Sequence, residues 1–115
     1  MSEKDEHMDA YQHSALLTAV YPGSGTLAGL TYTTLGLVGE AGEIANKVKK
    51  LHRGDKPLNE AAKADLAEEL GDVLWYVATM SEELGYDLSE VARMNLNKLQ
   101  SRQLRGQIKG DGDKR

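Results

Sequence analysis

The sequence predicts an all-α protein of four helices, with an antiparallel pair of long helices at its centre. Apolar residues recur at helical spacing through most of the 115 residues. A Gly-Asp-Lys-Pro break at residues 54–57 separates the two longest periodic segments, as expected for a turn between antiparallel helices. The chain has no Phe and one Trp, which indicates an aliphatic helical core that a partner subunit could complete.

The first helix is expected over about residues 5–20, where apolar side chains form a modest stripe: Tyr11, Ala15, Leu16 and Ala19. The run Tyr21-Pro-Gly-Ser-Gly25 then breaks the helix. His13 lies inside this segment, and a solvated surface histidine is favoured over a contact with a base or phosphate.

The second helix is expected from near Leu27 or Thr31 to Leu51. Its core stripe follows helical spacing: Leu37, Ala41, Ile44, Val48 and Leu51. Glycines at positions 36, 39 and 42 each cost about 1 kcal/mol relative to alanine inside a helix. Two explanations for their presence stay open, namely close approach by another backbone or ligand, and tight helix packing.

The third helix is expected from Asn59, a suitable N-cap, to Leu84, with Gly85 as its stop signal. Its apolar stripe comprises Leu66, Leu70, Val73, Val77, Met80 and Leu84. The fourth helix is expected to begin at Asp87-Leu-Ser-Glu90, which has the spacing of a capping box.

Asn95 and Arg102 share the predicted apolar side of this last helix, and Lys98 borders that side. A buried amide or guanidinium needs hydrogen-bonding partners. Those partners could be structural groups between the helices, or phosphates of a ligand. Because Arg102 lies near the expected helix end, where solvent can reach it, the ligand role is favoured.

Two acidic signatures stand out on the central pair, each with two carboxylates three residues apart: Glu40 and Glu43, then Glu69 and Asp72. Side chains at that spacing share one helix face. Counting from the turn places both pairs level across the predicted hairpin. Carboxylate oxygens suit a hard divalent cation such as Mg²⁺, and the absence of Cys argues against a thiolate metal site. The plain alternative is acidic decoration of a helix surface.

Basic residues accompany these acids and suit phosphate groups: Lys47, Lys50, Lys98 and Arg102. Carboxylates, a divalent metal and phosphate-binding cations together fit the hydrolysis of a phosphoanhydride. In that chemistry the metal offsets phosphate charge and lowers the pKa of an attacking water.

Three stretches of the sequence resemble MazG-like nucleotide pyrophosphohydrolases. They are Leu35-Gly-Leu-Val-Gly-Glu-Ala-Gly-Glu-Ile44, Lys49-Lys50 and Glu68-Glu-Leu-Gly-Asp-Val-Leu-Trp-Tyr76. The family pattern is ExxE, a spacer and ExxD, and the spacer here covers residues 44–68. The resemblance extends over about residues 11–102. Where some members carry a further acid before the first Glu, this chain has Gly39, so no base role is carried over to that position.

The resemblance implies Mg²⁺-dependent cleavage of a (deoxy)nucleoside triphosphate to the monophosphate and pyrophosphate, with Mn²⁺ as a possible substitute. It implies catalytic and metal-binding roles for Glu40, Glu43, Glu69 and Asp72. It implies phosphate contacts from Lys47, Lys50, Asn95, Lys98 and Arg102. Base contacts are expected from the first helix and residues 21–32. Homodimers or homotetramers are expected, with sites near subunit interfaces.

Residues 1–105 are expected to form one domain, followed by a flexible or substrate-closing tail at 106–115. The net charge of −4 argues against nucleic-acid binding, and no apolar run approaches the length of a membrane span. A charged start without an apolar stretch predicts a cytoplasmic protein. Two alternative functions remain open, a phosphoribosyl-ATP pyrophosphohydrolase and a non-catalytic helical interaction module.

Overall fold

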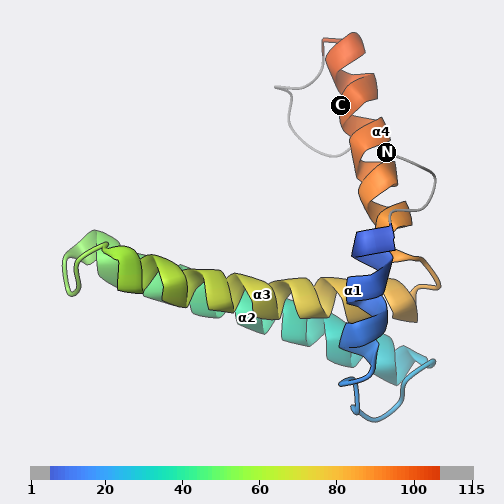
Figure 1. The fold of residues 1–115 in the computed structure, drawn as a ribbon, viewed down its shortest axis with the longest axis horizontal. Helices are drawn as coiled ribbons and strands as arrows, with labels where there is room; N and C mark the ends of the chain where they lie inside the picture. Colours follow the sequence, from blue (N-terminus) through green and yellow to red (C-terminus); the bar gives the residue numbers. More distant parts are fainter. Residues whose placement is uncertain (1–5, 107–115) are drawn as a thin grey trace.

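A computed structural model describes residues 6–106 and contains four helices in this part of the chain. Their bounds are α1 Glu6–Leu16, α2 Leu27–Arg53, α3 Glu60–Glu83 and α4 Leu88–Leu104. The long helices α2 and α3 pack against one another along their length as an antiparallel hairpin. Helix α1 crosses one end of this pair, and α4 leads away from it (Figure 1). The predicted all-α class and central helix pair are therefore confirmed.

The hairpin turn is built by local signals at both of its ends. Gly54 has a φ of 90°, a left-handed conformation that favours glycine, and its N–H donates to the Leu51 carbonyl at 3.1 Å. The Asp55 N–H donates to the Lys50 carbonyl at 3.0 Å, which completes the C-terminal cap of α2. Across the turn, the Asn59 side chain accepts the Ala62 N–H at 2.9 Å, so the predicted N-cap of α3 is confirmed.

Helix α1 is shorter than the sequence suggested and ends at Leu16. Tightened turns follow it, in which the Leu17 and Thr18 N–H groups bond carbonyls three residues back. Helix α4 begins with the predicted capping box, in which the Asp87 N–H donates to Glu90 Oε1 at 3.0 Å.

Gln12 of α1 joins α3 to α4, and only 3 % of it is exposed. Its amide nitrogen donates to the carbonyls of Ala78 and Tyr86 at 3.2 and 3.1 Å, and its oxygen accepts the Leu88 N–H at 2.8 Å. Asp9 accepts both the N–H and the hydroxyl of Ser89, at 3.0 and 2.8 Å. Two side chains of α1, Gln12 and Asp9, therefore help to cap α4, in addition to the local capping box.

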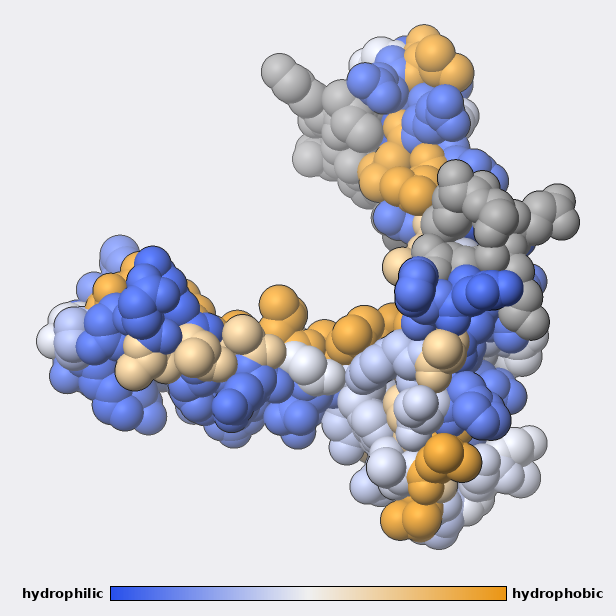
Figure 2. Space-filling model, in the orientation of Figure 1, coloured by the Kyte–Doolittle hydropathy of each residue, from blue (hydrophilic) through white to orange (hydrophobic). Residues whose placement is uncertain are grey.

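The buried core lies at this junction and is small. It consists of Ala15, Ala78 and Leu88, against which Tyr11, Trp75 and Val77 pack. The predicted stripes of the central pair are only partly covered: Ala41, Val48, Leu70 and Leu84 are exposed. The reason is geometric, because two helices side by side cover only the strip where they touch. Apolar surface remains visible along the pair and on α4 (Figure 2). Within residues 6–106, no helix has the length and apolar character needed to cross a membrane.

Candidate metal and phosphate site

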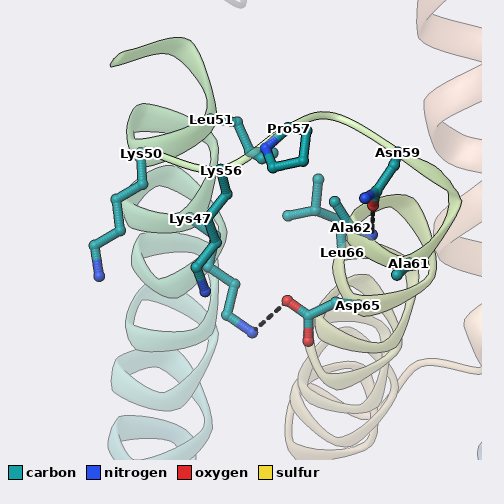
Figure 3. A pocket seen from close by; sticks show the side chains of 10 residues that line it. All are labelled: Lys47, Lys50, Leu51, Lys56, Pro57, Asn59, Ala61, Ala62, Asp65 and Leu66. Atoms are coloured by element: carbon teal, nitrogen blue, oxygen red, sulfur yellow. Dashed lines mark hydrogen bonds and ion pairs between the residues drawn. The ribbon is translucent and has the colours of Figure 1, made fainter. Parts of the chain in front are cut away.

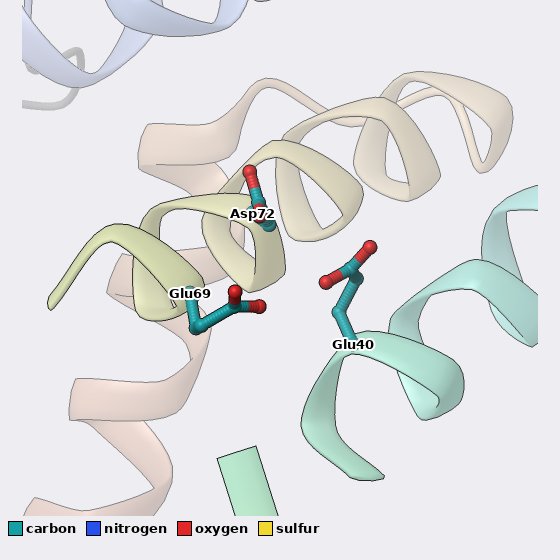
Figure 4. A group of neighbouring side chains, drawn as sticks. All are labelled: Glu40, Glu69 and Asp72. Carbon is teal, nitrogen blue, oxygen red and sulfur yellow. The ribbon is translucent and has the colours of Figure 1, made fainter. Parts of the chain in front are cut away.

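Three of the four predicted carboxylates come together in the middle of the hairpin. Glu40 projects from α2 toward Glu69 and Asp72 of α3 (Figure 4). One oxygen from each side chain lies within 4.8 Å of the others. Their meeting follows from the antiparallel pairing, because they lie at similar distances from the turn. Glu40 lies 13 residues before the end of α2 at Arg53. Glu69 and Asp72 lie 9 and 12 residues after the start of α3 at Glu60.

Glu43 is the fourth predicted ligand, and the structure leaves it outside this group. Its side chain is exposed, although its charge still acts on Glu40. The sequence pattern placed Glu43 on the same face as Glu40. The difference arises because the hairpin interface is narrow, so two side chains three positions apart need not both turn toward the facing helix.

The three carboxylates repel one another in the absence of a cation. Partial removal from water raises the pKa of Glu40 above its ordinary value, and the negative charges of Asp72, Glu69 and Glu43 raise it further. A divalent cation among these oxygens would remove that repulsion. Carboxylate oxygens are the ligands that Mg²⁺ and Mn²⁺ favour, so the donor set fits such an ion, held by Glu40, Glu69 and Asp72.

Lys47 connects this acidic group to the closed end of the hairpin. Its ammonium group donates to Glu69 Oε1 at 2.9 Å and to Asp65 Oδ2 at 2.8 Å. These two hydrogen bonds raise the pKa of Lys47, which stays charged throughout the physiological range. Lys47 was predicted to contact substrate phosphate, and the structure places it directly beside one of the three carboxylates.

Lys47 and Lys50 also line a hollow at the closed end of the hairpin, together with Lys56 and Asp65 (Figure 3). Lys56 lies in the connection between α2 and α3 and was not among the predicted phosphate ligands. The sequence did carry a signal for it, because four lysines lie within residues 47–56, around the predicted turn: Lys47, Lys49, Lys50 and Lys56.

The remaining predicted phosphate ligands lie on α4, away from the acidic group. Asn95 and Lys98 are exposed, whereas Arg102 is buried with 3 % of its surface exposed. The expectation that Asn95 is buried and that solvent reaches Arg102 was therefore wrong for this chain by itself. Among the described residues, α4 contacts α1 and α3 but not α2, and it points away from the hairpin.

Tyrosines lie on the other side of the acidic group. Tyr11 and Tyr32 belong to the segments expected to contact the base, whereas Tyr76 was not predicted as part of the site. Burial raises the pKa of Tyr76, and nearby Tyr32 and the charges of Glu40 and Asp72 raise it further. Burial also raises the pKa of Tyr11 in α1, and the negative charge of Asp72 raises it further. A helical count could have found Tyr76, because it lies four positions after Asp72 and so on the same side of α3.

Comparison with known proteins places this geometry in a family. Residues 29–105 match the model of the MazG nucleotide pyrophosphohydrolase domain. The chain is also 55 % identical over 113 residues to the gene 37 protein of Mycobacterium phage L5, an alignment that covers 95 % of this chain and 99 % of that protein. No solved structure matches the chain.

The match spans both helices that carry the acidic group, the lysine-lined hollow between them and the whole of α4. A hairpin with convergent carboxylates is thus found in the region that the domain model describes. The chain belongs to the MazG nucleotide pyrophosphohydrolase family.

Proposed function

We propose that this protein hydrolyses a nucleoside or deoxynucleoside triphosphate to the monophosphate and pyrophosphate in the presence of Mg²⁺. The observation that carries the proposal is the convergence of Glu40 with Glu69 and Asp72, whose oxygens approach within 4.8 Å. Family membership supports a pyrophosphohydrolase, and the scissile bond between the α and β phosphates is part of the proposal.

In this proposal the three carboxylates bind Mg²⁺, which supplies charge neutralisation at the phosphates and a more acidic water. A carboxylate of the group, or exposed Glu43 beside it, orients the attacking water. Lys47 holds Glu69 in place through its 2.9 Å hydrogen bond. Lys47 also brings a positive charge to the edge of the site, where it can bind a phosphate oxygen.

A second copy of the chain is part of the proposal. Asn95, Lys98 and Arg102 can act on phosphates at the acidic group only if another subunit supplies them, because α4 points away from the hairpin in its own chain (Figure 1). Exposed apolar side chains on both parts support such an assembly. They include Leu35, Val38, Leu70 and Leu74 on the hairpin, and Met94 and Leu96 on α4.

The direct test of the reaction is product identification with a panel of canonical and damaged triphosphates and Mg²⁺. We expect the monophosphate and pyrophosphate in equal amounts from at least one of them. Orthophosphate with a nucleoside diphosphate would contradict the proposed scissile bond, and no turnover of any triphosphate would contradict the reaction.

The shared site is tested by mixing two inactive variants, Asp72→Asn and Lys98→Ala. If one subunit supplies the carboxylates and the other supplies α4, random mixed dimers regain about one quarter of the wild-type sites. Each variant mixed with itself is the control. No recovery after subunit exchange would show that the site does not combine these residues from different chains.

A further inference from the structure

The closed end of the α2–α3 hairpin contains a hollow of about 520 Å³, within the size range of ligand pockets. Its walls come from the last turns of α2, the connecting segment and the first turns of α3. Leu51, Pro57 and Leu66 are among its apolar lining residues, and its charged lining residues are three lysines and one aspartate: Lys47, Lys50, Lys56 and Asp65.

These charged groups are not balanced equally. Lys47 is paired with Asp65 and Glu69, at 2.8 and 2.9 Å, so its charge is already compensated. Lys50 is directed away from α3 in Figure 3, and its charge acts on Asp55. Within residues 6–106, Lys56 makes no ion pair. Lys50 likewise makes no ion pair among these residues, but of the two lysines only Lys56 extends from the connection back along the hairpin toward Lys47 (Figure 3).

One side chain, Lys47, links the hollow to the acidic group. Lys47 lines the hollow and also touches Glu69, one of the three converging carboxylates. Lys47 lies seven residues after Glu40 on α2, which is about 10 Å along the helix. A chain of phosphates that reaches past a metal at the carboxylates toward the turn would thus meet Lys47 first and Lys56 next.

The opposite side of the acidic group has a different chemistry. Tyr76 follows Asp72 by one helical turn, and Tyr21 and Tyr32 stack with their ring centroids 4.9 Å apart. On this side, residues 21–39 and 73–83 offer aromatic rings and hydroxyls and include no lysine. This side suits the nucleoside half of a substrate better than its phosphates.

We infer that the hollow at the closed end of the hairpin is the subsite for the terminal phosphates of the substrate, and hence for the pyrophosphate product, with Lys56 as its principal cation. This inference rests on the proposed function and fixes the direction of the substrate: phosphates toward the turn and nucleoside toward the tyrosines. A charged hydrogen bond from Lys56 to a phosphate oxygen holds the leaving group.

The test compares Lys56→Ala with the wild-type protein in the presence of Mg²⁺. Calorimetry with inorganic pyrophosphate should show about tenfold weaker binding to Lys56→Ala, because one charged hydrogen bond is lost. Binding of the nucleoside monophosphate should change less than twofold. Lys56→Arg keeps the charge and should retain pyrophosphate binding, and pyrophosphate should inhibit Lys56→Ala less than wild type.

Lys49→Ala is the matched control, because Lys49 is exposed on α2 and does not line the hollow. An equal loss of pyrophosphate binding in Lys49→Ala and Lys56→Ala would overturn the inference, since it would reflect net charge alone. Weaker monophosphate binding with unchanged pyrophosphate binding would also overturn it, by placing the nucleoside in the hollow. Failure of the proposed reaction appears separately, as wild-type protein that binds pyrophosphate in the hollow but cleaves no triphosphate.

Discussion

The junction of α1 with α3 and α4 and the middle of the α2–α3 hairpin both bring polar side chains together, with opposite results. At the junction, Gln12 is buried and makes hydrogen bonds to three backbone groups, and Asp9 accepts two more. In the hairpin, the three like-charged carboxylates of Glu40, Glu69 and Asp72 lie close together. Of these three, only Glu69 has a lysine partner.

The difference separates the part of the chain that stabilises the fold from the part that we propose binds a metal ion. A buried polar group whose hydrogen bonds are all made stabilises one arrangement of helices. A group of carboxylates without a cation costs free energy in the folded state, which a metal ion can recover. We therefore expect substitutions at the junction to lower stability, and substitutions among the carboxylates to lower activity with little loss of stability.

The largest effect is expected for Asp72→Asn, which removes one charge with little change in shape. Mg²⁺-dependent hydrolysis should fall at least ~100-fold, because the metal contributes several kcal/mol to such reactions. The melting temperature without metal should stay the same or rise. Glu68→Gln is the control, since Glu68 precedes Glu69 but lies outside the converging group. Near-normal turnover by Asp72→Asn would contradict the proposed role of Asp72 as a metal ligand.

The next effect concerns stability. Gln12→Ala leaves the carbonyls of Ala78 and Tyr86 and the N–H of Leu88 without their side-chain partner. We expect a loss of about 2–4 kcal/mol in the free energy of unfolding, since unsatisfied buried polar groups are costly. Chemical denaturation measures it, with His13→Ala, an exposed neighbour, as the control. If Gln12→Ala were as stable as His13→Ala, the hydrogen bonds of Gln12 at the junction would contribute nothing to the stability of the fold.

A smaller effect separates two glycines of α2. A Cβ at Gly36 would lie 2.1 Å from Cε1 of Tyr76, so this glycine allows the helices to approach one turn before Glu40. We expect Gly36→Ala to cost about 1–3 kcal/mol by overpacking and to weaken metal binding, as the carboxylates move apart. Thermal melting and Mn²⁺ titration measure the two effects.

Gly42→Ala is the matched control, because a Cβ there meets no atom within 4 Å. In an isolated chain it should raise stability by about 0.5–1 kcal/mol through helix propensity. If Gly42→Ala instead lowered stability, a second chain would pack against this glycine in solution, as the proposed assembly allows.

The smallest effect concerns Glu83, which fastens the segment before α2 to the end of α3. Its carboxylate accepts hydrogen bonds from Tyr21 at 2.5 Å, Ser24 at 3.1 Å and the Gly25 N–H at 2.9 Å. These bonds lower the pKa of Glu83 below its ordinary value, and the bond from the Tyr21 hydroxyl contributes most. Burial, and after it the hydrogen bond to Glu83, raises the pKa of Tyr21 to about 12.

Because the pKa of Glu83 is lower in the folded than in the unfolded chain, its stabilising contribution is present above the ordinary glutamate pKa. That contribution is lost as the pH falls through the lowered, folded-state value. Wild-type protein should thus melt a few degrees above Glu83→Gln near neutral pH, and the difference should shrink in acid. A difference that did not vary with pH would show that the charge of Glu83 is unimportant.

Much of this protein followed from local sequence signals. The break at residues 54–57, the Asn59 cap and the Asp87–Glu90 capping box each act within a few residues, so the sequence predicted four helices and most of their ends. The end of α1 was missed because Leu17, Thr18 and Ala19 have no strong helix-breaking character, and tightened turns replace the last expected turn.

The acidic pairs were also visible in the sequence, since spacing along a helix is local and turn position sets which residues lie level. Which carboxylates converge was decided by the tertiary structure, because the rotation of each helix about its axis depends on contacts such as Gly36 with Tyr76. The direction of α4 was likewise beyond local signals. It depends on Gln12 and Asp9, which are more than 70 positions away in sequence, and distant hydrogen bonds of this kind leave no periodic pattern to read.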